Sequence, residues 1–315
     1  MSVKVGFIGL GAMGLPMAKR VVGGGYATFT TFHRRREPAD ELAAAGARVV
    51  ESPADVARAA DVVITILPAD RELKEVVLGP RGVLEGLGPG KVLVDMTTAT
   101  ALTMEEVARA VSAAGAGVLD APVSGGTPAA AQGTLTIMVG GDEALLERCR
   151  PVLATMGTNI VHVGAVGQGK VVKMVNQAMA AAHLLILGEA FALGVRCGAW
   201  PETLYDVIKA SSGYSRMMDL RLPGFLLDGK FEPGFRLDLM KKDVNLALQS
   251  AQALNVPMLL TSVVGQVFAA ASTAGHGDAD FSAAAQHVAE MAGVRLSAAG
   301  TSPQARMSAV PENTP

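Results

Sequence analysis

The hexapeptide Gly9-Leu10-Gly11-Ala12-Met13-Gly14 constrains the fold more than any other stretch, because it spaces three glycines as GxGxxG between two predicted elements. The apolar run 3–8 before it is typical of a buried strand, and residues 16–22 after it are typical of a helix. In that setting the first glycine makes a tight turn, the second lets a pyrophosphate approach the backbone, and the third lets helix and strand pack closely. These residues are therefore predicted to bind a dinucleotide at a helix N-terminus, the alternative being a glycine-rich turn without a ligand.

Short β-branched runs alternate with alanine-rich helical patterns over the first half of the chain. Strands are predicted at 3–8, 27–32, 62–67, 92–96, 118–120, 135–139 and 160–163. Helices are predicted at 16–22, 39–45, 54–60, 72–77, 104–114 and 143–156. Continuous apolar strands that alternate with helices are typical of a parallel sheet covered on both faces. We therefore expect an α/β Rossmann domain, with a doubly wound and mostly parallel sheet, over residues 1–165.

Helical patterns dominate after residue 169, and no convincing strand follows. The predicted helices are 170–198, 201–211, 237–254 and 258–274. The first of them is roughly 40 Å long at 1.5 Å per residue, a length that suits a helix joining two domains. We therefore expect an all-α substrate and oligomerisation domain over residues 166–296, and a polar tail over 297–315 that is expected to be disordered.

The apolar segment 178–195 is long enough to raise the question of a membrane helix, but it contains His183 and Glu189. We expect it to be buried in a domain or oligomer core, with no membrane partner. The net charge of -2 does not provide the basic field that a nucleic-acid surface needs. Two cysteines make neither a disulfide framework nor a zinc site, so we expect no metal centre and a cytoplasmic location.

The end of the second predicted strand distinguishes the two nicotinamide cofactors. It reads His33-Arg34-Arg35-Arg36, with no acidic residue before Glu37. An NAD site usually has an acid here to hold the ribose 2′-hydroxyl, whereas guanidinium groups bind a 2′-phosphate bidentately. NADP(H) is therefore favoured over NAD(H), with His33, Arg34 and Arg35 as candidate contacts. A solvated basic turn is the alternative, above all for Arg36.

Ligands of open α/β sheets lie outside the carboxyl ends of the strands. Leu67 and Pro68 follow one predicted strand and Thr97-Thr98 follows another, so Leu67, Pro68 and Thr98 are predicted to complete the cofactor crevice. Ser124, Gly125 and Gly126 follow a third strand, where backbone N–H groups and a hydroxyl can hold a carboxylate. Ordinary turns are the alternative in each case.

Lys173 and Asn176 are three residues apart in a predicted helix, so they share a face. A lysine in an otherwise apolar helix is costly unless it is paired or used, and near a cofactor it can transfer a proton to or from a substrate oxygen. Lys170 is a rival that the pattern alone does not separate from Lys173. Lys242 and Asp243 form a second polar pair in a later helix, with a solvated helix face as the alternative.

Together these stretches resemble the β-hydroxyacid dehydrogenase family, of the 3-hydroxyisobutyrate dehydrogenase and tartronate semialdehyde (2-hydroxy-3-oxopropionate) reductase type. The resemblance covers about residues 3–294 and rests on four ordered motifs. The motifs are residues 5–14, residues 120–126, residues 167–176, and Pro233-Gly234-Phe235 leading to Lys242-Asp243.

The resemblance implies a role for each matching residue. Lys173 would be the catalytic acid/base, and Lys242 would lie near the nicotinamide and the substrate, supported by Asp243. The substrate would be held by Ser124, Gly125, Gly126 and Asn176. The family also implies a Rossmann domain joined by a long helix to an all-helical domain, and a homodimer or homotetramer.

The expected activity is NADP(H)-preferring interconversion of a small anionic 3-hydroxy acid and its semialdehyde, with tartronate semialdehyde ahead of 3-hydroxyisobutyrate. Alternatives are succinic semialdehyde or glyoxylate reduction, imine reduction by a relative that usually lacks this lysine, and a non-catalytic nucleotide-binding interaction protein. Arg216 lies where the family shapes substrate choice, and we hypothesise that it meets a second anionic group.

Overall fold

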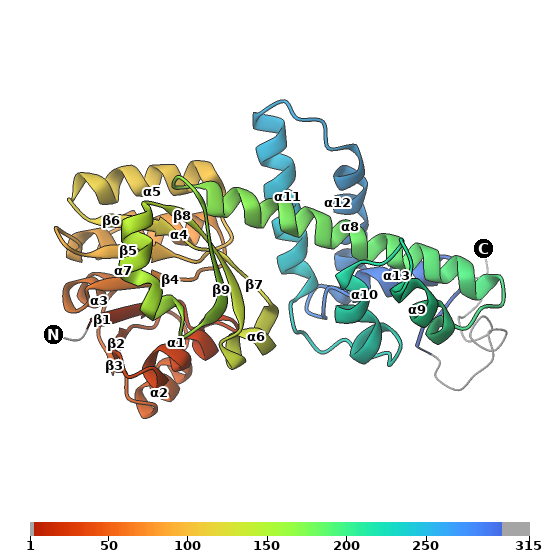
Figure 1. Ribbon diagram of the computed structural model, residues 1–315, viewed down its shortest axis with the longest axis horizontal. Coiled ribbons are helices and arrows are strands. Elements are labelled where there is room, and N and C mark those ends of the chain that lie inside the picture. Colours follow the sequence, from red (N-terminus) through yellow and green to blue (C-terminus); the bar gives the residue numbers. More distant parts are fainter. Residues whose placement is uncertain (1–2, 298–315) are drawn as a thin grey trace. The chain divides into compact units, whose positions relative to one another are not determined.

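The computed structural model describes residues 3–297, and the chain divides into two compact units between Met174 and Val175 (Figure 1). The division lies inside a long helix, so this helix contributes to both units. The predicted domain limits at residues 165 and 296 stay a prediction. The predicted disorder of the tail concerns residues 298–315, which lie outside the described part of the chain.

The first unit is built on a nine-stranded sheet with the order β3-β2-β1-β4-β5-β6-β8-β7, in which β9 also pairs with β8. The strands are β1 (Lys4–Ile8), β2 (Ala27–Thr30), β3 (Arg48–Val49), β4 (Val62–Thr65), β5 (Val92–Asp95), β6 (Gly117–Asp120), β7 (Val123–Ser124), β8 (Leu135–Gly141) and β9 (Gly157–Gly164). Pairing is parallel from β3 through to β6, whereas β8 runs antiparallel to β6 and β7. This mostly parallel sheet confirms the predicted fold class.

Helices cover both faces of this sheet and form a separate core on each. They are α1 (Gly14–Gly23), α2 (Glu37–Ala44), α3 (Pro53–Ala59), α4 (Asp70–Leu78), α5 (Ala101–Ala113), α6 (Gly126–Gln132) and α7 (Glu143–Leu153). Val5 and Phe7 of β1 pack with Met17 of α1, because alternate strand residues point to one face. Gly6 points to the other face, where a Cβ would lie 2.5 Å from Val56 Cγ1 of α3.

The second unit is helical. It contains most of α8 (Gln168–Arg196), followed by α9 (Pro201–Lys209), α10 (Arg216–Arg221), α11 (Leu237–Ala253), α12 (Leu259–Ala271) and α13 (Ala283–Met291). Leu184 and Phe191 of α8, Leu237 of α11 and Phe268 of α12 belong to one buried core. Over residues 175–297 the structure contains no strand beyond an isolated bridge between Arg236 and Asp280. The predicted order, an α/β unit joined by a long helix to a helical unit, is confirmed.

Helix α8 is long and apolar enough to cross a membrane by length and composition alone. Half of its most apolar window is buried inside the protein. One such helix is weak evidence for a membrane, because core helices of soluble proteins pass the same test.

Candidate active site

The three glycines of the loop after β1 have different environments. Gly9 has a φ of +104°, and a Cβ on it would lie 2.0 Å from the Ile66 carbonyl oxygen. A Cβ on Gly14 would lie 1.8 Å from the Gly9 carbonyl oxygen, so both positions are closed to larger residues by the protein itself. A Cβ on Gly11 would meet no protein atom within 4 Å. The space above Gly11 is therefore free for a ligand, as the second glycine of a dinucleotide loop requires.

A cleft of about 520 Å³ lies over this loop. Leu10, Gly11 and Ala12 line it together with Arg35, and Glu37 and Glu41 also contribute. Glu41 forms an ion pair with Lys19 of α1. Met13 is half-buried at the N-cap of α1 and does not line the cleft. The predicted cofactor loop and one arginine of the basic turn thus share a single cavity.

The basic turn between β2 and α2 contains residues with different partners. His33, Arg34 and Arg35 are exposed. Arg36 Nε lies 3.1 Å from Asp40 Oδ1, and its guanidinium carbon lies 5.2 Å from the centre of the Phe32 ring. Arg36 is therefore held by contacts within the chain itself.

A buried network joins the carboxyl ends of β4 and β5 to the first turn of α8. Asp95 Oδ1 accepts hydrogen bonds from the hydroxyls of Thr65 at 2.6 Å and Thr97 at 2.7 Å. Lys170 Nζ lies 2.6 Å from Asp95 Oδ2 and also donates to the carbonyl oxygens of Asp95 and Thr97. All of these side chains are buried. A charged pair at this depth is favourable only when further hydrogen bonds satisfy it, and here they do.

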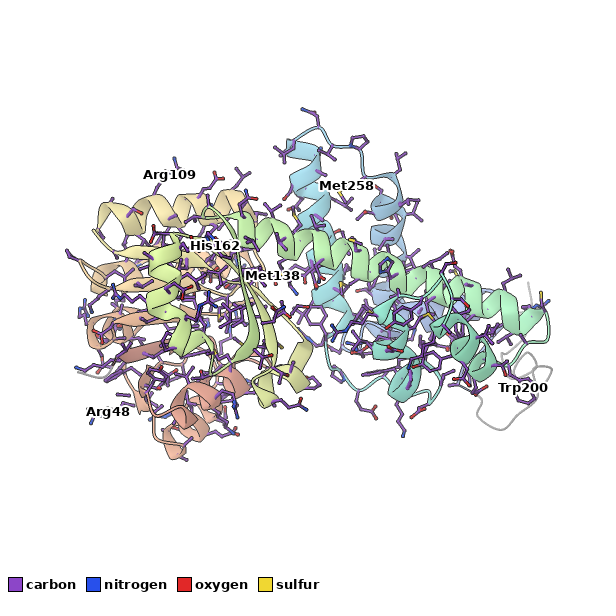
Figure 2. The ribbon with its side chains drawn as sticks, in the orientation of Figure 1. Arg48, Arg109, Met138, His162, Trp200 and Met258 are labelled. Carbon is purple, nitrogen blue, oxygen red and sulfur yellow. The ribbon has the colours of Figure 1, made fainter. Side chains whose placement is uncertain are left out.

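Asp120 at the end of β6 fixes the start of α8. Its carboxylate accepts from Gly167 N at 2.7 Å and from Lys170 N at 2.9 Å, so a negative charge faces the positive helix end. Burial raises the pKa of the Asp120 carboxyl, and the charge of Lys170 opposes this rise. A Cβ on Gly169 would lie 2.5 Å from the carbonyl oxygen of Met138, which Figure 2 labels on β8. The glycine after Gln168 therefore lets α8 begin close to the sheet.

Lys170 and Lys173 differ in their surroundings although they are one helical turn apart. Lys170 donates three hydrogen bonds to Asp95 and Thr97 inside the first unit. Lys173 also belongs to this unit, and 8% of it is exposed. The structure thus shows that Lys170, which the sequence pattern does not separate from Lys173, forms a structural ion pair with Asp95.

A second network lies in the helical unit. Gln177 Nε2 of α8 donates to Asp243 Oδ2 of α11 at 2.7 Å, and Lys242 Nζ lies 2.8 Å from Asp243 Oδ1. Asn176 Nδ2 donates to Gln177 Oε1 at 3.1 Å. The structure therefore brings together Asn176, Lys242 and Asp243 through Gln177, a buried residue that the sequence analysis missed. A second amide directly after Asn176 in an apolar helix was the available signal.

The predicted substrate loop joins β7 to α6. Ser124 ends β7 and is half-buried. Gly125 and Gly126 have φ values of +135° and +69°, a region that favours glycine. A Cβ on Gly125 would lie 2.6 Å from Ala129 Cβ, so this turn is closed to larger residues.

The other predicted cofactor residues lie at the ends of neighbouring strands. Leu67 N donates to Thr97 Oγ1 at 3.0 Å, which places the segment after β4 beside the segment after β5. The Thr97 hydroxyl is fully used in the network around Asp95, whereas Thr98 is half-buried and Pro68 is exposed.

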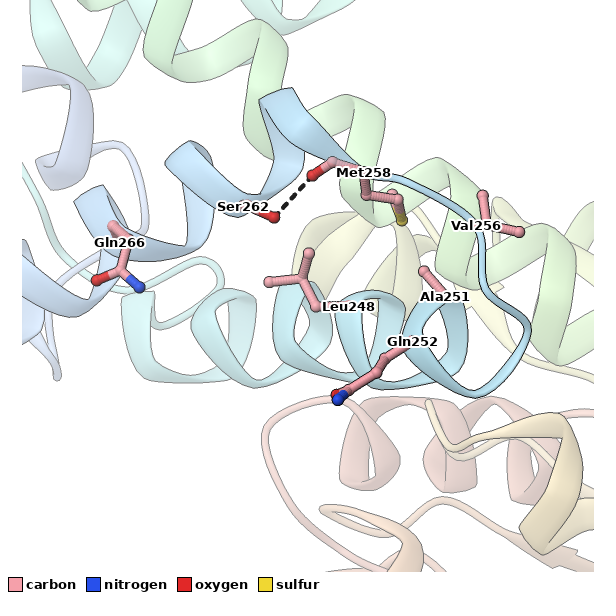
Figure 3. Close-up of a pocket in the computed structure, with 7 residues that line it drawn as sticks. All are labelled: Leu248, Ala251, Gln252, Val256, Met258, Ser262 and Gln266. Atoms are coloured by element: carbon pink, nitrogen blue, oxygen red, sulfur yellow. Dashed lines mark hydrogen bonds between the residues drawn. The ribbon is translucent and has the colours of Figure 1, made fainter.

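A separate pocket of about 310 Å³ lies in the helical unit between the end of α11 and the start of α12 (Figure 3). Leu248, Met258 and Ser262 line it, and Ser262 Oγ donates to the Met258 carbonyl oxygen at 2.7 Å. No lining residue carries a titratable side chain, so this pocket offers no acid or base.

Comparison with known proteins covers both units. Residues 4–164 match the family described as the NAD binding domain of 6-phosphogluconate dehydrogenase. Residues 167–288 match the family described as NAD-binding of NADP-dependent 3-hydroxyisobutyrate dehydrogenase.

Similar proteins match along most of their length and of this chain. The chain is 40% identical over 296 residues to 2-(hydroxymethyl)glutarate dehydrogenase of Eubacterium barkeri. The aligned region covers 94% of this chain and 98% of that relative. It is 36% identical over 294 residues to 2-hydroxy-3-oxopropionate reductase of Escherichia coli (strain K12), at 93% and 100% coverage. The solved structure of 3-hydroxyisobutyrate dehydrogenase of Mycobacterium tuberculosis with L-serine is 34% identical, with a TM-score of 0.85 and coverage of 91% and 99%.

These matches set aside the non-catalytic alternative, because they extend over both units at substantial identity. Together with the open glycine loop, they show that the chain is an NAD(P)-dependent dehydrogenase acting on CH–OH groups, a member of the 3-hydroxyisobutyrate dehydrogenase (β-hydroxyacid dehydrogenase) family.

Proposed function

We propose that the protein interconverts a small 3-hydroxy acid and its semialdehyde, prefers NADP(H) to NAD(H), and uses Lys173 as its acid/base. One observation carries the choice of lysine. Lys170 Nζ is engaged by Asp95 and by the Thr97 carbonyl oxygen in a buried network, so it is not available to a substrate. Lys173, one turn along α8, is the lysine that can exchange a proton with substrate.

The substrates named for the relatives support a common chemical class. 3-Hydroxyisobutyrate and 2-(hydroxymethyl)glutarate carry a hydroxymethyl group on the carbon next to a carboxylate, and 2-hydroxy-3-oxopropionate carries the corresponding aldehyde. They differ in the remaining substituent on that carbon. We propose 2-hydroxy-3-oxopropionate first and 3-hydroxyisobutyrate second. We propose that Arg216, which is exposed at the start of α10, binds a second carboxylate of the substrate where one is present.

The proposed chemistry assigns a task to each group. In the oxidative direction the neutral amine of Lys173 accepts the hydroxyl proton while the carbinol carbon loses a hydride and its C–O bond becomes a carbonyl. In the reductive direction the Lys173 ammonium returns that proton to the carbonyl oxygen. When bound, the nicotinamide supplies or accepts the hydride.

Substrate binding is proposed for the loop at Ser124, Gly125 and Gly126 and for Asn176. The positive φ values of the two glycines turn successive backbone N–H groups into an arrangement that suits a carboxylate. Gln177 and Asp243 fix the orientation of Asn176 and Lys242. We propose that the positive charge of Lys242 lies near the substrate and the nicotinamide and that Asp243 holds Lys242 in place.

The proposed preference for NADP(H) rests on the position of Arg35. This arginine lines the same cleft as Gly11 and Ala12, so it is the guanidinium placed to meet a 2′-phosphate. His33 and Arg34 are exposed beside it. Glu41, an acid in the cleft, is neutralised by Lys19, which reduces its repulsion of a phosphate.

We also propose that the chain forms a homodimer or homotetramer and is cytoplasmic. Val175, Met179, Ile186 and Leu193 of α8 are each more than half exposed, and the last three are spaced by seven residues. Such a stripe suits the corresponding helix of a second copy. An Ile186→Lys/Leu193→Lys variant is expected to lower the mass in solution, and a monomeric parent protein would contradict the proposal. Free Cys149 and Cys197 suit a reducing compartment.

The proposed activity is tested with a steady-state panel of semialdehyde acids, each with NADPH and with NADH. The panel contains 2-hydroxy-3-oxopropionate, methylmalonate semialdehyde, succinic semialdehyde and glyoxylate. The highest kcat/KM is expected for one of the first two with NADPH. An NADH preference of about tenfold or more, close to 1.4 kcal/mol, would refute the cofactor proposal.

A further inference from the structure

Three side chains with metal-binding atoms converge in the helical unit, where the chain leaves α12 and α13 passes beside it. They are His276, in the turn Ser272–His276, and His287 and Glu290 of α13. One ligand atom from each lies within 4.8 Å of the others, and the two imidazole centres are 5.8 Å apart. All three residues are half-buried, so an ion in solution can reach them.

The backbone and its hydrogen bonds bring these groups together. His287 and Glu290 are three residues apart in α13 and therefore share a face. Gly275 has a φ of +98°, and this kink carries His276 out of α12 towards α13. Gln286 Nε2 donates to Glu290 Oε1 at 3.1 Å and orients the carboxylate. A hydrogen bond of this kind to a ligand carboxylate is common around metal ions in proteins.

We propose that His276, His287 and Glu290 bind a divalent ion of the Zn²⁺ class. Two imidazoles and one carboxylate are a zinc donor set that leaves a fourth position for water, whereas Mg²⁺ and Ca²⁺ favour oxygen ligands. Zinc bonds of about 2.0–2.1 Å place tetrahedral ligands about 3.3 Å apart. The three half-buried side chains would therefore close on the ion by rotation about their side-chain bonds. None of the residues assigned to the dehydrogenase reaction belongs to this site.

The ion would link two segments that the fold holds by separate contacts. It would join the kink after α12 to α13, whose Gln286 also accepts a hydrogen bond from Leu296 N at 3.3 Å. The site is therefore a stabilising clamp in the helical unit. No metal centre was expected from the sequence, because the two cysteines make no zinc site. The His-x10-His-x2-Glu spacing matches none of the usual zinc patterns either.

The test uses tag-free, metal-stripped full-length protein, titrated calorimetrically with ZnCl2 and with MgCl2 and examined by thermal unfolding. One Zn²⁺ per chain is expected at this site. The midpoint temperature of thermal unfolding is expected to rise by about 2–4 °C at a free Zn²⁺ concentration roughly tenfold above the Kd. Mg²⁺ is expected to leave the midpoint unchanged.

His276→Ala and His287→Ala are each expected to weaken zinc binding by about tenfold or more, and Glu290→Gln by a smaller factor. His183→Ala, which removes an exposed histidine from α8, is the matched control and is expected to bind zinc as the parent does. The thermal unfolding midpoint of each variant without metal shows whether the variant folds as the parent does. Absence of zinc binding, binding that survives in both histidine variants, or equal stabilisation by Mg²⁺ would overturn the proposal.

Discussion

Lys170 Nζ lies 2.6 Å from Asp95 Oδ2, and both side chains are fully removed from solvent. The pair ties the first turn of α8 to the end of β5, with Asp120 holding the backbone of the same turn. The helix that carries Lys173 is thereby fixed to the sheet edge at which a dinucleotide binds in this fold.

Replacement of Lys170 by methionine is expected to destabilise the first unit by about 3–5 kcal/mol, because it leaves the Asp95 carboxylate buried without its cation. The exposed Lys74–Glu106 pair supplies the control, and Lys74→Met is expected to change stability by less than about 1 kcal/mol. Urea denaturation measures both free energies of unfolding. Equal effects of the two variants would contradict the structural role of Lys170.

Two glycines of the cofactor loop are expected to respond in opposite ways to an added methyl group. Gly14→Ala places a Cβ 1.8 Å from the Gly9 carbonyl oxygen and is expected to cost about 3 kcal/mol or more. Gly11→Ala meets no protein atom within 4 Å, so stability should hold while the KM for the cofactor rises. Thermal unfolding and cofactor titration separate the two effects. A Gly11→Ala protein with parental cofactor KM would argue against a pyrophosphate above this residue.

Arg35→Ala is expected to raise the KM for NADPH by about tenfold to a hundredfold and to leave that for NADH nearly unchanged, because a charged hydrogen bond to the 2′-phosphate is lost. Arg36→Ala is the matched control, since Arg36 is held by Asp40 and Phe32. Initial rates with both cofactors measure the ratio. An Arg36→Ala effect as large as that of Arg35→Ala would contradict Arg35 as the specific contact of the 2′-phosphate.

Burial raises the pKa of the Cys149 thiol from 9.0 to about 11. At pH 8 the exposed Cys197 is therefore expected to react with a thiol reagent, while Cys149 reacts only after unfolding. Because the pKa is raised in the folded state, its stabilising contribution is complete below pH 9 and is lost as the pH rises towards 11. Thiol counting in native and denatured protein tests this, and two rapidly reacting thiols in native protein would disagree with it.

The sequence predicts the elements that have strong local patterns. β1, the glycine loop and α1 follow from an apolar run, three spaced glycines and an amphipathic helix. Helix α6 escapes prediction because it consists of small residues and buries only Ala130. Helix α13 buries residues on most faces and has no apolar stripe to recognise. The two-residue strands β3 and β7 are too short to show a period.

In the candidate site, too, local spacing can be read from the sequence, whereas contacts between distant residues cannot. The glycine positions from Gly9 to Gly14 are evident from spacing, whereas spacing alone does not separate Lys173 from Lys170. The Lys170–Asp95 pair joins residues 75 positions apart, so only the folded chain shows that Lys170 is held by Asp95. Gln177 was missed for a similar reason, because its partner Asp243 lies 66 positions away on α11.

The most direct measurement is the kcat of Lys173→Met with the best semialdehyde acid of the panel and NADPH, alongside its cofactor affinity and unfolding midpoint. We expect kcat to fall by about 10²–10⁴-fold, as for loss of a general acid/base, while NADPH binding and the midpoint remain near those of the parent. Turnover at the parental rate would contradict the assignment of Lys173 as the group that exchanges the proton.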